Sequence, residues 1–286
     1  MLNSGFHRHH PGGNTLRAMS DAESIPLRVG LLVVDSIDEP HRRIAGDYFD
    51  LFEGLLARHD VDLVSHDGRS SSLPGSDTCD GWIVPGSRAS VHDDLHWRPQ
   101  LTEWVRRALD SAVPLVGVCF GHQLIAQALG APVAKSESGW SVGAIDYDVL
   151  GAPPGASHTP ASYRILASHQ DQVLELPPGA TLLASAPTCP IAAYSYGGHV
   201  YCVQGHPEFV PEQAASIYSS RIEQLGRDTY ETAMRSLDRS LDNDLVGAWI
   251  ATALRSAAEL TIHSAGGNDV LEPRPGSFGA PAPSFR

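Results

Sequence analysis

One cysteine in the chain has neighbours that would make it reactive. Cys119 stands in Gly117-Val118-Cys119-Phe120-Gly121, between an apolar run typical of a strand and a segment typical of a helix. Flanking glycines permit the sharp strand-to-helix turn that exposes a nucleophile, and a helix N-terminus favours thiolate over thiol. The segment predicts a cysteine nucleophile, although a lone cysteine is commonly just a small buried side chain.

A cysteine nucleophile needs a base, and the segment Gln204-Gly205-His206-Pro207-Glu208-Phe209 offers one at the exit of an apolar run. Pro207 restricts its own φ and the backbone of His206, so Glu208 can bind one ring nitrogen while the other faces the thiol. A His-Pro-Glu sequence alone is more often a capped turn. Together with the cysteine segment it predicts a triad of Cys119, His206 and Glu208. Because the acid follows the histidine, the order differs from that of an α/β-hydrolase.

Charge that develops on a substrate oxygen would need backbone donors nearby. Pro85-Gly86-Ser87 ends an earlier apolar run, so the Gly86 amide is positioned to form an oxyanion hole with the amide of Phe120. The alternative for this segment is a simple tight turn.

Short apolar runs alternate with segments whose apolar residues recur at helical spacing. We expect strands at 27–34, 61–64, 82–84, 114–118, 142–149, 163–167, 180–184, 191–196 and 200–204. We expect helices at 48–58, 101–108, 123–129, 211–225 and 244–260. Gly197-Gly198 is a hairpin signal. The pattern predicts a three-layer α/β fold, with a mixed, mainly parallel sheet, helices on both faces and an antiparallel extension in the second half.

Composition limits the classes of partner. The 286 residues carry a net charge of −13, with 42% hydrophobic and 19% charged residues. These percentages are ordinary for a globular protein. The negative net charge, with Lys135 as the only lysine, argues against nucleic acid or an anionic membrane as partners. Neither the histidines nor the cysteines (Cys79, Cys119, Cys189 and Cys202) have the spacing of a disulfide framework or a metal site. We expect no cofactor and a reducing, cytoplasmic location.

The two ends differ from the middle of the chain. Residues 1–25 are His-rich at the start and lack a secretion signal, and the C-terminal segment is rich in Gly, Pro and Ser. We expect a disordered leader at 1–25, one domain at 26–262 and a disordered tail at 263–286. A phosphate-binding loop is not expected, because Ala134 precedes Lys135-Ser136 where glycine is needed.

Cys119 with its flanking glycines, Gln123 and His206-Pro207-Glu208 together resemble the class I, triad-type glutamine amidotransferase domain. The resemblance runs from about Leu27 to Leu225 and implies a flavodoxin-like fold. Gly86-Ser87, Ser90-Val91-His92-Asp93 and Ser168-His169-Gln170-Asp171 look like the stand-alone, GMP-synthase-like branch, which also includes γ-glutamyl peptidases.

The resemblance implies a role for each matching residue. Cys119 would be the nucleophile, His206 the acid and base, and Glu208 the residue that orients His206. Gly86 and Phe120 would donate to the oxyanion. Gln123, Ser168 and His169 would lie near the bound glutamine. The implied reaction forms a γ-glutamyl thioester, releases ammonia for an acceptor, and then releases glutamate.

Three functions remain open. The first is hydrolysis of the glutamine side-chain amide, with a separate synthetase or acceptor subunit to receive ammonia, because no synthetase domain is expected after Leu260. The second is a γ-glutamyl peptidase or transferase that acts on a glutathione-like compound with the same triad. The third is a regulatory binding module without turnover, which an intact triad disfavours. The first two share glutamine or a γ-glutamyl compound as the expected ligand.

Overall fold

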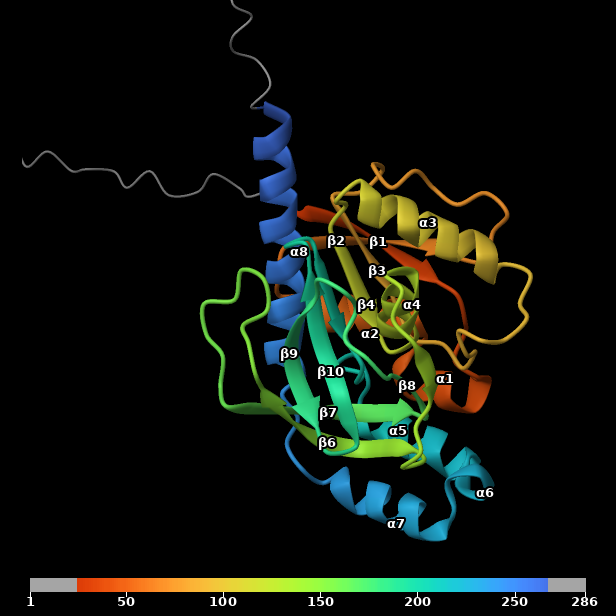
Figure 1. Ribbon diagram of the computed structural model, residues 1–286. Coiled ribbons are helices and arrows are strands. Elements are labelled where there is room, and N and C mark those ends of the chain that lie inside the picture. The colour runs from red at the N-terminus through yellow and green to blue at the C-terminus, as the bar shows by residue number, and fades with distance from the viewer. Residues whose placement is uncertain (1–24, 267–286) are drawn as a thin grey trace, which may run out of the picture.

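The computed structural model describes residues 25–266 (Figure 1), so the predicted leader and most of the predicted tail lie outside the described residues. Its centre is a 9-stranded sheet with the order β2-β1-β3-β4-β11-β10-β9-β6-β7. A second sheet pairs β5 with β8. In chain order the strands are β1 (Leu27–Val33), β2 (Val61–Asp67), β3 (Gly81–Val84), β4 (Leu115–Val118), β5 (Val133–Lys135), β6 (Ser141–Val149), β7 (Ser162–His169), β8 (Asp171–Val173), β9 (Thr181–Ala186), β10 (Cys189–Tyr196) and β11 (Val200–Val203).

The direction of the sheet changes at β11. This strand pairs parallel with β4 and antiparallel with β10, and every pairing from β2 to β11 is parallel while every pairing from β11 to β7 is antiparallel. Gly197 and Gly198 turn the β10–β11 hairpin with φ of 60° and 75°, which glycine adopts readily. The predicted mixed sheet with an antiparallel extension is confirmed.

Helices cover both faces of the sheet (Figure 1). They are α1 (Glu39–Ala45), α2 (Tyr48–Leu56), α3 (Arg98–Asp110), α4 (Phe120–Ala128), α5 (Pro211–Ser220), α6 (Ile222–Leu225), α7 (Arg227–Ser236) and α8 (Asn243–Gly266). One apolar core joins α2, α5 and α8 to the sheet, and a second joins α3 and α4 to its opposite face. The three-layer prediction is therefore confirmed.

Two helices were not predicted, and the limits of others differ from the expectation. α1 buries no residue and α7 buries only Ala233, so neither has the apolar stripe by which a helix is recognised. The helix expected at 211–225 is interrupted at Arg221, whose φ of −111° and ψ of 14° leave the helical region. α4 begins at Phe120 rather than at residue 123, and α8 extends to Gly266 rather than ending at residue 260.

Candidate active site

Cys119 lies between β4 and α4 with a backbone that non-glycine residues rarely adopt. Its φ is 52° and its ψ is −99°, a conformation that costs on the order of 1–3 kcal/mol unless neighbouring contacts hold it. Two of those contacts are main-chain hydrogen bonds: the Cys119 N–H donates to Val203 O at 3.0 Å, and the Cys119 carbonyl accepts from the Gln123 N–H at 3.1 Å. The predicted strand-to-helix corner is present.

The glycines beside the cysteine make the corner possible because backbone approaches backbone there. A Cβ at Gly117 would lie 2.6 Å from the carbonyl of Gly121, and one at Gly121 would lie 2.0 Å from Val84 O. No side chain fits at either position without moving β3, β4 or α4. The sequence pattern thus reflects close packing of these elements as well as the turn itself.

His206 and Glu208 form a buried pair at the end of β11. His206 Nδ1 is 2.7 Å from Glu208 Oε1, and both side chains are almost fully buried. The main chain is held by the His206 N–H, which donates to Leu166 O at 2.7 Å. The Phe209 ring stacks on the imidazole with 4.1 Å between ring centres. These contacts leave the ring little freedom to turn.

The imidazole also lies within hydrogen-bonding reach of the Cys119 side chain. Burial lowers the pKa of His206, but the charges of Cys119 and Glu208 and their hydrogen bonds outweigh it and raise the pKa above the ordinary value. The three predicted triad side chains therefore lie together, in an arrangement that favours a protonated imidazole.

The two predicted oxyanion donors, Gly86 and Phe120, each lie next to a member of this pair: Gly86 lies against His206, and Phe120 follows Cys119 directly in the chain. A Cβ at Gly86 would lie 2.7 Å from His206 Cε1, so the backbone that follows β3 lies against the imidazole ring. Phe120 is the first residue of α4, where a helix leaves its N–H groups without partners inside the helix. β3 and β4 are adjacent parallel strands, so both segments leave the sheet at the same edge.

Two connected cavities open at this edge. The first, of about 520 Å³, is lined by Cys119 but not by His206, and we call it the Cys119 cavity. The second, of about 650 Å³, is lined by His206 but not by Cys119, and we call it the His206 cavity. They share wall residues, which include Ser168 and Arg221. The candidate nucleophile and the candidate acid thus line different ones of the two adjoining cavities.

The sequence of residues 52–223 matches the family Glutamine amidotransferase class-I. The chain belongs to this glutamine amidotransferase family. It is 32% identical over 195 residues to gamma-glutamyl peptidase 3 of Arabidopsis thaliana, an alignment that covers 65% of this chain and 78% of that protein. It is 38% identical over 116 residues to one subunit of the glutamine-hydrolyzing GMP synthase of Thermococcus kodakarensis, covering 40% of this chain and 61% of the other.

Solved structures confirm the glutamine amidotransferase fold. The crystal structure of a glutamine amidotransferase from Thermotoga maritima superposes with a TM-score of 0.65 at 16% identity, covering 82% of this chain and 98% of that one. That of a glutamine amido transferase from Methylobacillus flagellatus gives a TM-score of 0.59 at 22% identity, covering 89% and 99%.

The residues predicted to lie near a γ-glutamyl group line the Cys119 cavity of this family member. Gln123 is buried, and its Nε2 donates to Asp171 O at 2.8 Å and to Gln204 Oε1 at 3.2 Å. Ser168 accepts from Arg221 Nη1 at 3.1 Å. The two GMP-synthase-like segments meet here as well, because Ser90 Oγ donates to Asp171 Oδ2 at 2.5 Å.

Two further histidines are buried near the site. Burial, with repulsion from His206, lowers the pKa of His169 to about 3, so this ring is neutral. Burial likewise lowers the pKa of His122 to about 3. The His122 ring is fully buried and packs on the Tyr194 ring with 4.9 Å between ring centres.

Three positions around the His206 cavity were not singled out from the sequence. Tyr48 lies at the start of α2, and burial, with smaller contributions from the charges of Asp35, Glu208 and Cys119, raises its pKa well above the usual value. Asp35 binds Arg88 through both the backbone N–H, at 2.8 Å, and the guanidinium. Arg221 interrupts the predicted helix. None of them belongs to a recognisable local motif, so no sequence signal was available.

The other cysteines differ from Cys119. Burial raises the pKa of Cys189 and of Cys202 to about 12, which keeps both thiols protonated. Within residues 25–266 no helix has the length and apolar character needed to cross a membrane. The same residues place no three His, Cys, Asp or Glu side chains where they could hold a metal ion.

Proposed function

We propose that this glutamine amidotransferase hydrolyses a γ-glutamyl amide through Cys119, His206 and Glu208. The observation that supports it most strongly is the buried His206–Glu208 pair of 2.7 Å beside the strained Cys119 corner. A nucleophile, an acid and base, and an orienting carboxylate are the groups that thiol-dependent acyl transfer requires. The matched family adds the expectation that the acyl group is γ-glutamyl.

In the first half of the reaction the Cys119 thiolate attacks the carbonyl carbon of the γ-amide. A C–S bond forms, and the oxygen gains negative charge that the amides of Gly86 and Phe120 stabilise. Loss of one such donor costs about 2.7–4 kcal/mol in comparable sites. The C–N bond then breaks as His206 gives its proton to the departing nitrogen, which leaves a γ-glutamyl thioester.

In the second half water takes the place of the amine. His206, now neutral, accepts a proton as the water oxygen attacks the thioester carbon. The C–S bond breaks, glutamate leaves and the thiolate returns beside a protonated imidazole. Glu208 keeps the ring oriented and stabilises its charge throughout. The cycle uses only these side chains and water.

Two amides suit this chemistry, and they differ in the group that leaves. Glutamine would release ammonia, which would pass to a separate synthetase or acceptor subunit, by analogy with the relative whose name describes part of a GMP synthase. A γ-glutamyl peptide would release an amine or amino acid, as the names of the plant relatives suggest. The second candidate is favoured by one observation: the His206 cavity, at about 650 Å³, is far larger than ammonia needs. We place either reaction in the cytoplasm, where the Cys119 thiol stays reduced.

The test is an assay of wild-type protein and Cys119→Ala with glutamine and a panel of γ-glutamyl amides, following glutamate release. We expect wild type to turn over at least one of them. We expect Cys119→Ala to lose essentially all turnover with an unchanged circular dichroism spectrum. Cys202→Ala is the matched control, because that thiol is buried in the sheet.

The trapped intermediate gives a second measurement. Intact-mass analysis after rapid quenching should show a γ-glutamyl adduct on wild type and none on Cys119→Ala. Equal rates from the two proteins would place the chemistry elsewhere. A wild-type protein that releases glutamate from no γ-glutamyl compound and forms no adduct would favour the regulatory binding module instead.

A further inference from the structure

The position of His206 decides on which side of the scissile bond each part of a substrate lies. In the proposed reaction the imidazole must reach the departing nitrogen within about 2.6–3.2 Å to protonate it. The acyl group, once bound to Cys119 Sγ, must occupy the space that the cysteine faces. Since only the Cys119 cavity is lined by Cys119 and only the His206 cavity by His206, the two halves of a substrate separate between them.

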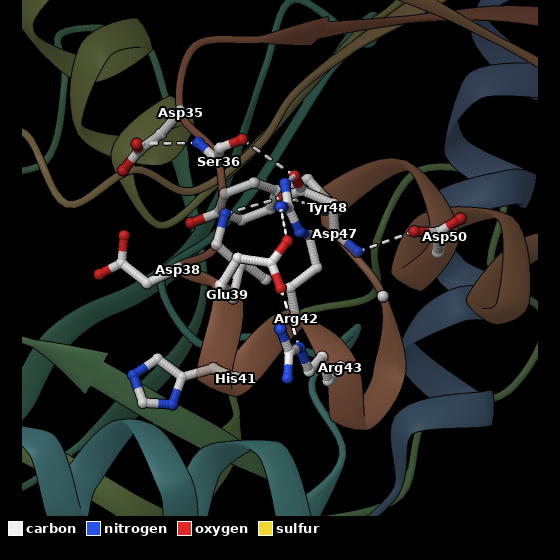
Figure 2. Close-up of polar contacts among 12 residues, drawn as sticks. Asp35, Ser36, Asp38, Glu39, His41, Arg42, Arg43, Asp47, Tyr48 and Asp50 are labelled. Carbon is white, nitrogen blue, oxygen red and sulfur yellow. Dashed lines mark hydrogen bonds and ion pairs between the residues drawn. The ribbon is translucent and has the colours of Figure 1, made fainter.

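The His206 cavity has an apolar side and a polar side. Ile37, Phe209 and Ile217 are buried residues that line it. The loop at 35–38 and α1 form another wall and are held in place by their own polar contacts (Figure 2). Among these, Ser36 Oγ donates to Asp47 Oδ2 at 3.0 Å, and Glu39 binds Arg42 and Arg43. A space of this size with an apolar side fits an organic amine rather than ammonia.

The two arginines that line the His206 cavity differ in their partners. Arg88 is neutralised, because its guanidinium binds Asp35 at 2.8 Å and Asp38 at 2.6 Å. Arg221 has no carboxylate within 4.0 Å among residues 25–266. Its Nη1 donates to the neutral hydroxyl of Ser168, and its guanidinium lies 6.0 Å from the centre of the Trp140 ring. Arg221 is thus a cation whose charge no acidic side chain in the described structure balances.

Arg221 also lies where the two cavities join, since it lines both. It is half-buried, and Tyr48 lines the same His206 cavity. A planar guanidinium with donors left over is suited to binding a carboxylate in a two-pronged manner. A partly buried cation of this kind gains most from an anionic ligand that enters the cavity with it.

We propose that the His206 cavity is a subsite for the leaving group, and that Arg221 selects γ-glutamyl amides whose amine half is an α-amino acid by binding its carboxylate. The inference rests on the proposed hydrolysis at Cys119. It adds that the amine half is an amino acid with an apolar side chain, which packs on Ile37, Phe209 and Ile217. Cleavage balances as before: the C–N bond breaks, His206 supplies the proton, and the free amino acid leaves through the His206 cavity.

The test compares three substrates on wild-type protein: γ-glutamyl-leucine, γ-glutamyl-leucinamide and glutamine. The first two differ only in the carboxylate that Arg221 is proposed to bind. We expect kcat/KM for γ-glutamyl-leucine to exceed that for γ-glutamyl-leucinamide by about 10- to 100-fold, the range of a hydrogen bond to a charged group. We expect it to exceed that for glutamine as well.

Variants then show which residue causes the preference for γ-glutamyl-leucine. In Arg221→Gln the preference for γ-glutamyl-leucine over γ-glutamyl-leucinamide should fall about 10- to 100-fold, and Arg221→Lys should restore part of it. Ser220→Trp would place a ring in the His206 cavity, which Ser220 lines from an exposed position, and should lower the ratio of kcat/KM for γ-glutamyl-leucine to that for glutamine. Arg227→Gln is the control: it also removes one positive charge, but lies on α7 in an exposed pair with Glu231 and lines neither cavity.

The outcomes separate the two proposals. If wild type hydrolyses glutamine but not γ-glutamyl-leucine, the leaving-group subsite is overturned while hydrolysis at Cys119 stands. If wild type cleaves the two leucine compounds equally, or Arg221→Gln slows both equally, Arg221 does not read the leaving-group carboxylate and the proposal fails. If wild type cleaves none of the three compounds and forms no adduct with them, the leaving-group proposal fails, and the panel of γ-glutamyl amides decides whether hydrolysis at Cys119 stands. Should Arg221→Gln not fold, the wild-type comparison of the two leucine compounds decides.

Discussion

The Cys119 corner and the wall of the His206 cavity are built by different means. At the corner, β3, β4 and α4 approach so closely that glycine is required at 117 and 121, and main-chain hydrogen bonds hold the cysteine. The wall consists of the loop at 35–38, α1 and the α5–α6 junction, joined by contacts between polar side chains (Figure 2). The residues proposed to carry the chemistry are therefore held in place by the backbone. The residues of the cavity wall, which polar side-chain contacts hold in place, would determine which leaving group is accepted.

The comparison predicts that the corner is the less tolerant of the two regions. In Gly121→Ala the new Cβ would lie 2.0 Å from Val84 O, a backbone atom that cannot rotate away. We expect α4 to shift, the protein to lose about 3 kcal/mol of stability and turnover to fall more than tenfold. Thermal unfolding and the glutamate assay measure both.

A matched glycine variant is available in α2. A Cβ at Gly54 meets nothing within 4 Å, so Gly54→Ala should stabilise the protein by roughly 0.5–1 kcal/mol. If Gly121→Ala were as stable and as active as wild type, the close-packed description of the corner would be wrong.

The second-largest effect is expected for the His206–Glu208 pair, which lies between the Cys119 corner and the wall of the His206 cavity. Glu208→Gln keeps the shape of the side chain but removes the charge that, with Cys119, raises the pKa of His206. Because a positive imidazole loses a negative neighbour, its pKa falls, and the alkaline limb of the pH profile of kcat/KM should move to lower pH. Turnover at neutral pH should fall about 10²- to 10⁴-fold.

The control for this change is Glu212→Gln on the exposed first turn of α5, which alters the same charge away from the ring. Its pH profile should match that of wild type. An alkaline limb that stayed in place in Glu208→Gln would show that another group governs it.

The smallest effect is expected in the wall. Asp35 has its pKa lowered: burial raises it, but Arg88 and backbone N–H groups outweigh burial. A carboxyl whose pKa is depressed by folding stabilises the protein above its unfolded pKa of about 4 and loses this effect as pH falls. Arg88 is half-exposed, so Asp35→Asn should cost about 1 kcal/mol.

Unfolding of Asp35→Asn and wild type by urea at several pH values measures this difference. It should be present at pH 7 and vanish as the pH falls below the range in which Asp35 is ionised. A difference that was the same at every pH would show that the carboxylate charge plays no part.

Much of the molecule could be predicted along the chain because the information is local. Every expected strand is present within a few residues, since alternating apolar runs identify buried strands. Cys119 with its glycines and His206 with Glu208 are short motifs whose backbone consequences lie within a few residues. The location of the site at one edge of the sheet follows from these motifs, because adjacent parallel strands leave their carboxyl-end residues side by side.

What could not be predicted has no local signal. α1 is stabilised by Pro40, by ion pairs between Glu39 and the arginines after it, and by contacts with α5. None of these contacts requires apolar residues at helical spacing, which is the pattern that identifies a helix in a sequence. The burial of His122 depends on Tyr194, from a strand far along the chain. Arg221 shows its importance only when its neighbours are known.

The amino-acid sequence alone determined the order of the strands along the chain, the sharp turn at Cys119 and the pairing of His206 with Glu208, because short-range sterics and hydrogen bonds dictate each. Folding of the whole chain, by contrast, places the nucleophile and the imidazole in different cavities and leaves the charge of Arg221 unbalanced between them. Both are properties of side chains from distant segments, and long-range packing alone brings those segments together.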